Sequence, residues 1–134
     1  MSKKLLTIFS LLLIFFAMSC NNKSTDPTVN NNSTDPTAPL KDSQYVGKWY
    51  DEKNQNDIKF EIKQDGSIDW FDQTEQPAAS ASGTNVKKEG DAVFKATFLK
   101  NGETNEFVFT FTSDAAGSMT FQGNPPYTYK VVKK

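Results

Sequence analysis

The stretch Phe107-Val108-Phe109-Thr110-Phe111 decides the fold of this sequence. Three phenylalanines alternate with other residues, so a β-strand would direct all three rings to one face, because successive side chains of a strand point to opposite sides. An amphipathic helix would instead repeat its apolar residues every three to four positions. One face is therefore buried and the other meets solvent, which favours antiparallel pairing.

The same alternation recurs at 58–62, 94–98 and 127–131, and turn signals separate these stretches. Asp65-Gly66 and Asn101-Gly102 are the strongest of them, because hairpin turns need residues that tolerate positive φ. We expect one long loop at 73–83 and no helix beyond a single turn at 77–81. The strands are predicted near 46–52, 57–63, 67–72, 84–89, 92–99, 104–112, 118–122 and 127–133.

Eight short strands joined in sequence predict an all-β domain, a single small antiparallel up-and-down barrel over residues 42–134. A two-sheet β-sandwich is the alternative. An eight-stranded barrel has an interior just wide enough for side chains or one small ligand. The residues expected inside are bulky, which predicts a filled core with a shallow aromatic cup at one mouth: Trp49, Phe60, Trp70, Phe94, Phe98, Phe107, Phe109, Phe111, Phe121 and Tyr129.

The composition removes most catalytic arrangements. The chain has no histidine, its 15 basic residues are all lysines, and Cys20 is its one cysteine, so Ser-His-Asp, Cys-His and the usual zinc sites are excluded. With 16 acidic residues, the charge balance gives no reason to bind nucleic acid. Four acidic residues surround the third expected strand, but their spacing does not predict a metal site: Asp65, Asp69, Asp72 and Glu75. We expect no enzyme and no cofactor.

The N-terminus has the pattern of an export signal. Lys3 and Lys4 precede the apolar run 5–16, and small residues stand just before Cys20. This pattern resembles a bacterial lipoprotein signal with its lipobox. The resemblance implies that residues 1–19 are removed and that Cys20 is lipidated and holds the protein on a membrane. An ordinary cleaved signal and an uncleaved anchor are the alternatives.

Residues 20–41 predict a disordered tether behind the lipidated cysteine. The segment from 21 to 40 is rich in Asn, Ser, Thr and Pro and contains a near repeat, Ser24–Thr28 and Ser33–Thr37. Such a composition cannot bury enough apolar surface to offset the entropy of ordering.

A second resemblance lies at the first expected strand, which reads Tyr45-Val46-Gly47-Lys48-Trp49-Tyr50. Gly-x-Trp at the start of a small all-β domain is similar to the first motif of the lipocalin-like (calycin) barrels. The resemblance implies that Gly47 and Trp49 are structural residues that close one end of the barrel. It also implies a basic residue near the tryptophan on the last strand, a part that Lys130 is expected to play.

These features together predict a non-enzymatic, lipid-anchored binding protein of the bacterial cell envelope, with the outer membrane favoured over the inner one. We expect a monomer that contacts the membrane through Cys20 and binds either a small apolar ligand or an envelope protein or glycan. An inhibitor-type interaction protein and a purely structural or antigenic surface lipoprotein are the alternatives.

Overall fold

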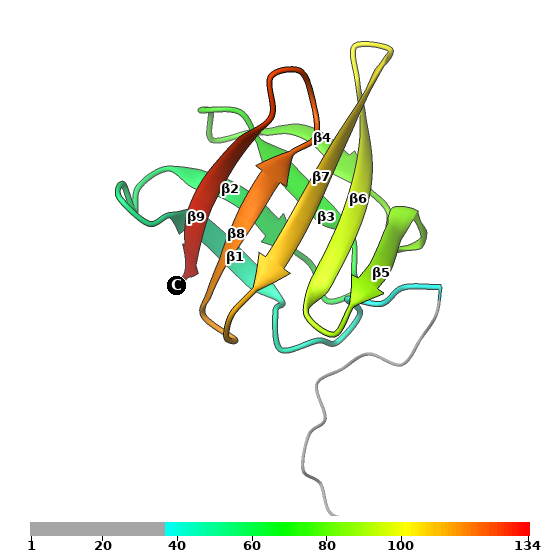
Figure 1. Ribbon diagram of the computed structural model, residues 1–134, viewed down its shortest axis with the longest axis vertical. Coiled ribbons are helices and arrows are strands. Elements are labelled where there is room, and N and C mark those ends of the chain that lie inside the picture. The colour runs from blue at the N-terminus through cyan, green and yellow to red at the C-terminus, as the bar shows by residue number, and fades with distance from the viewer. Residues whose placement is uncertain (1–36) are drawn as a thin grey trace, which may run out of the picture.

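The computed structural model describes residues 37–134 as one strongly curled antiparallel sheet (Figure 1). The expected signal, Cys20 and tether residues 20–36 lie outside the described residues. Among residues 37–134 there is one short 3₁₀ turn, Gly83–Asn85, and no helix long and apolar enough to cross a membrane. The strands are β1 (Gly47–Asp51), β2 (Ile58–Ile62), β3 (Ile68–Phe71), β4 (Pro77–Ala81), β5 (Val86–Gly90), β6 (Val93–Lys100), β7 (Glu103–Phe111), β8 (Ala116–Phe121) and β9 (Tyr127–Lys133).

The sheet is a nearly closed barrel with the order β4-β3-β2-β1-β9-β8-β7-β6-β5. β1 pairs with both β2 and β9, so the first and last strands are joined in the middle of the sheet. The two ends of the sheet curl towards each other, and β4 comes to lie against β6. The predicted all-β barrel is confirmed, and the sandwich alternative is not what the chain adopts.

The barrel has nine strands rather than eight, because the expected loop 73–83 contains β4. The stretch Pro77-Ala78-Ala79-Ser80-Ala81 has no bulky or β-branched residue and therefore gives no strand signal. Its strand conformation comes from pairing with β3, where Trp70 stands opposite Ala79. Pro77 is tolerated because it is the first residue of a strand at the edge of the sheet.

One end of the barrel is sealed by residues 38–46, which precede β1 (Figure 1). Leu40 is fully buried in the core although it precedes the expected domain start at Asp42. At Gly66, φ is +82° and a Cβ atom would lie 2.7 Å from the backbone nitrogen of Lys41, so only glycine lets the segment approach this closely. Ordered packing therefore begins before Asp42. We call this end the sealed end.

Aromatic rings occupy the barrel interior from the sealed end to the opposite end. Tyr45 stacks on Phe111 with ring centroids 4.0 Å apart, and the contacts continue ring to ring along the barrel. Of the residues expected inside, eight are buried, whereas Phe121 and Tyr129 are partly buried at the far end of the series. The contacts run Tyr45–Phe111, Phe111–Trp49, Trp49–Phe60, Phe60–Phe109, Phe109–Phe107, Phe107–Phe121, Phe121–Tyr127 and Tyr127–Tyr129.

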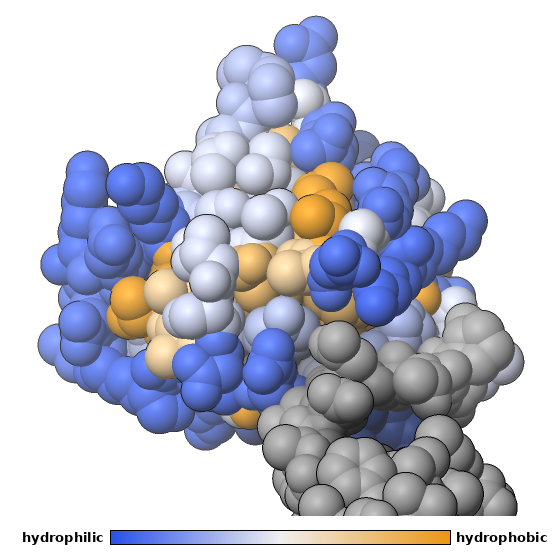
Figure 2. Space-filling view, turned by 60° about the horizontal axis from the view of Figure 1, so that its bottom comes forward, coloured by the Kyte–Doolittle hydropathy of each residue, from blue (hydrophilic) through white to orange (hydrophobic). Residues whose placement is uncertain are grey.

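Turning the molecule so that the bottom of Figure 1 comes forward shows only short stretches of apolar surface, bordered by polar residues (Figure 2). The large apolar side chains are inside the barrel, and two large hydrophobic residues of the described chain, Leu99 and Tyr127, are exposed. Both belong to the half of the barrel away from the sealed end, so this half carries the exposed large apolar side chains of residues 37–134.

Candidate functional site

The Gly47-x-Trp49 motif lies at the sealed end. Trp49 is fully buried, and its indole N–H donates a hydrogen bond to the carbonyl of Tyr45 over 2.9 Å. The basic residue near its ring is Lys133, with the ammonium 5.9 Å from the ring centroid, and not Lys130, whose side chain is exposed. Lys133 stands directly opposite Trp49 in the β1–β9 pair. The expectation for Lys130 was wrong because its neighbours Tyr129 and Val131 point inward, so residue 130 points outward.

Lys133 also connects the sealing segment to β9 by a hydrogen bond. Its ammonium donates to the carbonyl of Gln44 at 2.6 Å, which holds the sealing segment to the last strand. At Gly47, where φ is +131°, a Cβ atom would lie 3.3 Å from Cδ of Lys133. These groups pack and hydrogen-bond within the sealed end and face its interior.

Four connections meet at the opposite end, which we call the loop end. They are 52–57 between β1 and β2, 72–76 between β3 and β4, the turn at 101–102, and 122–126 between β8 and β9. In Figure 1 several of them rise together, away from the sealing segment. The antiparallel pairing of all neighbours in the sheet places these four connections at one end, with β4 and β5 running in the same direction.

Aromatic side chains are partly exposed to solvent at the loop end. Tyr127 is 42% exposed and contacts the ring of Phe121, with centroids 5.0 Å apart. Partial burial raises the pKa of its phenol above the usual range, and Tyr129 and Asp72 contribute further in the same direction. Tyr127 therefore stays neutral at ordinary pH and presents an uncharged aromatic face to solvent.

Lys59 is a buried charge at the same end. Its alternation with Ile58 and Phe60 predicts a place on the solvent face of β2, but its side chain is only 6% exposed. The alternation fails because β2 bulges against β1 between Phe60 and Ile58, opposite Trp49 and Tyr50. The ammonium lies 2.7 Å from Oδ2 of Asp57 and 4.2 Å from the ring centre of Tyr129. The chain thus holds a paired cation under the aromatic surface.

A second ion pair crosses the loop end between β3 and β6. Lys100 Nζ lies 2.7 Å from Oδ2 of Asp72 and 4.9 Å from the ring centre of Trp70. Both groups of this pair are partly exposed, so the pair is worth little in stability. The pair places two charges at this end, with Lys100 over the buried ring of Trp70 and Asp72 close enough to Tyr127 to affect its pKa.

The other carboxylates considered from the sequence do not converge. Asp69 pairs with Lys63 over 2.8 Å, and this hydrogen-bonded contact raises the pKa of the lysine. Asp65 accepts hydrogen bonds from the hydroxyl and the backbone N–H of Ser67, which lower the pKa of its carboxyl group. In the part of the chain from residue 37 on, no group of three or more acidic residues is placed to hold a metal ion.

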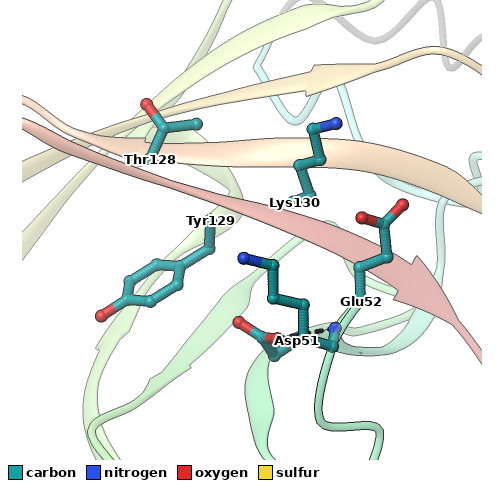
Figure 3. Close-up of a pocket in the computed structure, with 6 residues that line it drawn as sticks. Asp51, Glu52, Thr128, Tyr129 and Lys130 are labelled. Carbon is teal, nitrogen blue, oxygen red and sulfur yellow. Dashed lines mark hydrogen bonds between the residues drawn. The ribbon is translucent and has the colours of Figure 1, made fainter.

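Two pockets flank the β1–β2 connection. The larger, about 460 Å³, is lined by residues 51–53 and 128–130, and so lies where β1 ends beside β9 (Figure 3). In the close-up, Thr128 and Lys130 extend from one side of β9 and Tyr129 from the other. The second pocket, about 370 Å³, lies between residues 54–58 and 73–75. Neither pocket could be predicted from the local sequence, because both depend on where paired strands end.

The rims of both pockets carry polar side chains that are free to meet a ligand. Within residues 37–134, Glu52, Lys53 and Lys130 take part in no ion pair and no side-chain hydrogen bond. Around the second pocket the same holds for the side chains of Gln73 and Glu75. Unpartnered polar groups beside an aromatic surface can recognise a polar partner by hydrogen bonds.

Comparisons of this chain with protein-family models, with curated proteins and with solved structures give no match.

Proposed function

We propose that this chain is a lipid-anchored, non-enzymatic binding protein of a bacterial cell envelope, with Cys20 as its anchor and the loop end as its binding surface. The observation that carries the proposal is the polarity of the barrel. The chain enters the domain through residues 38–46 at the sealed end, and four connections, both pockets and the exposed ring of Tyr127 lie at the other end. An anchor upstream of the sealing segment would leave the loop end facing away from the membrane.

The filled interior favours a partner bound at the surface over a small apolar ligand inside. The ring series from Tyr45 to Tyr129 occupies the barrel axis, and Phe107 and Phe109 at its centre are fully buried. A hollow barrel would instead leave space between its inward side chains. The loop end offers pockets of mixed polarity, a composition suited to an envelope protein or glycan.

The anchor is tested with Cys20→Ala and metabolic labelling with a clickable fatty acid in a lipoprotein-processing bacterium. We expect the wild-type chain to carry the label and to fractionate with membranes, and the variant to lose both, because stable anchoring needs covalently attached acyl chains. Ser19→Ala, which keeps a small residue before the cysteine, is the matched control and should keep the label. A Cys20→Ala chain that remains labelled and membrane-bound would contradict the anchor.

The binding role is tested separately by native mass spectrometry of the whole chain carrying Cys20→Ala, after mixing with a detergent extract of its own host's envelope. A retained protein or glycan that is displaced by substitutions at the loop end supports the proposal. A tightly held small apolar molecule that survives those substitutions would point back to a ligand inside the barrel.

A further inference from the structure

The larger pocket exists because β1 is shorter than β9. β1 ends at Asp51, opposite Val131, whereas β9 begins four residues earlier in its own direction, at Tyr127. The backbone N–H of Glu52 still donates to the carbonyl of Lys130 over 2.9 Å. Beyond that bond the chain turns away from β9, and the pocket opens between residues 51–53 and 128–130.

The direction of the backbone groups of β9 follows from its hydrogen bonds. The N–H of Lys133 donates to Ala115 on the β8 side, and the N–H of Lys134 donates to Lys48 on the β1 side. Because these directions alternate along an antiparallel strand, odd-numbered residues of β9 bond to β8 and even-numbered residues face β1. The N–H and carbonyl of Thr128 and the N–H of Lys130 therefore point into the pocket.

The chain itself supplies no strand for these groups. If β1 continued, Asn54 would be the residue opposite Thr128, two positions beyond the Glu52–Lys130 contact. The N–H of Asn54 instead donates to Oδ1 of Asp51 over 3.1 Å, and the N–H of Lys53 donates to the same oxygen over 2.8 Å. This turn within residues 51–54 leaves a short, preformed open edge, which consists of the N–H and carbonyl of Thr128 and the N–H of Lys130.

We propose that this open edge of β9 binds an extended peptide segment, which adds to the sheet as a short further strand at the loop end. Two donors and one acceptor alternate along the edge as they do along any strand, and this pattern is the complement of another extended backbone. The inference rests on the proposed function only in placing the partner at the loop end, and it does not depend on the lipid anchor.

The side chains around the edge carry both signs of charge, with Lys53 and Lys130 against Asp51 and Glu52. They therefore do not select the charge of the bound segment, and its extended backbone is what the edge recognises. A second copy of this chain is a poorer occupant, because of its two sheet edges β4 lies against β6 and begins with a proline, and β5 carries Lys87 and Lys88. Lysines and proline protect a sheet edge from pairing.

The test is a selection of random phage-displayed peptides on the whole chain carrying Cys20→Ala, followed by affinity measurements with the selected peptides made synthetically. Thr128→Pro removes the backbone N–H from the open edge, and a proline is tolerated where a strand's N–H does not take part in the ladder. Thr128→Val is the matched control, because it also removes the hydroxyl group but keeps the N–H. We expect Thr128→Pro to bind roughly tenfold more weakly and Thr128→Val to bind as wild type.

Amide hydrogen exchange of the unsubstituted residue 128 gives a second readout that does not depend on the folding of a variant. In the free chain the N–H groups of Thr128 and Lys130 should exchange fast and that of Tyr129 slowly, and the peptide should slow Thr128 and Lys130 and leave Tyr129 unchanged. The proposal is overturned if Thr128 is already protected in the free monomer, or if selected peptides bind Thr128→Pro and wild type equally. It is also overturned if the edge becomes protected only by self-association, or if a glycan array binds at this pocket and peptides do not.

Discussion

Replacing Trp49 should be among the most damaging single changes in this barrel. Its side chain is fully buried between Phe60, whose ring centroid is 5.6 Å away, and Phe111 at 4.8 Å. Trp49→Ala removes the largest core side chain at the sealed end and leaves a cavity that the surrounding rings cannot fill. We expect the free energy of unfolding to fall by about 3–5 kcal/mol, a large part of the ~5–15 kcal/mol typical of a whole domain.

A milder substitution separates the packing of Trp49 from its hydrogen bond. Trp49→Phe keeps most of the ring but removes the indole N–H, so the buried carbonyl of Tyr45 loses its donor at 2.9 Å. An unsatisfied buried acceptor costs about 1–3 kcal/mol. Thus Trp49→Phe should fall between wild type and Trp49→Ala, and it keeps the experiment informative if the alanine variant does not fold.

The assay is urea unfolding followed by far-UV circular dichroism, which does not depend on the removed fluorophore. The slope of the free energy against urea should stay the same for the phenylalanine variant, since it reports the surface exposed on unfolding. A loss below about 1 kcal/mol for Trp49→Ala would mean that the tryptophan does not close the barrel end, because burial of this extent requires the larger cost.

Three further measurements test other parts of the structure. Asp57→Ala should cost about 1–3 kcal/mol in urea unfolding, because it leaves Lys59 charged and buried without its partner, whereas Lys59→Met should be close to neutral; the reverse order would refute the buried pair. Gly66→Ala should destabilise the barrel clearly more than Gly102→Ala, since both have φ near +82° but only residue 66 would collide with the sealing segment; equal effects would mean that this segment is not docked. The phenol of Tyr127 should titrate above its ordinary pKa in ultraviolet absorbance, and its contribution to stability should be present at neutral pH and lost as the pH rises through that raised pKa; a Tyr127→Phe chain with unchanged alkaline unfolding would contradict this.

The alternation of apolar and polar residues predicted the barrel because each strand must bury one of its faces, and this requirement can be read from each strand separately. Phe107, Phe109 and Phe111 can be buried together only on a strand, and no distant contact is needed to infer it. The strand β4 could not be inferred in this way. Its alanines and Ser80 have little preference for a strand, and their conformation is set by the neighbouring β3. The sealing residue Leu40 was missed for a similar reason, since one leucine in a polar segment gives no periodicity.

The candidate site was harder to predict because it depends on pairing register. Lys59 reads as a solvent-facing residue, and only the bulge in β2 turns it inward. Lys133 could have been found from the sequence, because it continues the inward series of Tyr129 and Val131 at a spacing of two residues. The open edge of β9 could not, since it requires knowing which residue of β1 stands opposite each residue of β9.

The open edge of β9 depends on one carboxylate, that of Asp51. Asp51 accepts the N–H groups of Lys53 and Asn54, and the N–H of Asp51 itself donates to the carbonyl of Asp57 over 2.9 Å. Together with the bond from the N–H of Asp57 to the carbonyl of Asn54, they close the β1–β2 connection on itself, so the N–H and carbonyl of Asn54, which would have extended β1 along β9, are already satisfied. The loop therefore gains nothing by closing over Thr128, and the edge stays open without strain. A site formed in this way is ready for a partner before the partner arrives, so binding there incurs little of the ordering cost that a flexible loop would add.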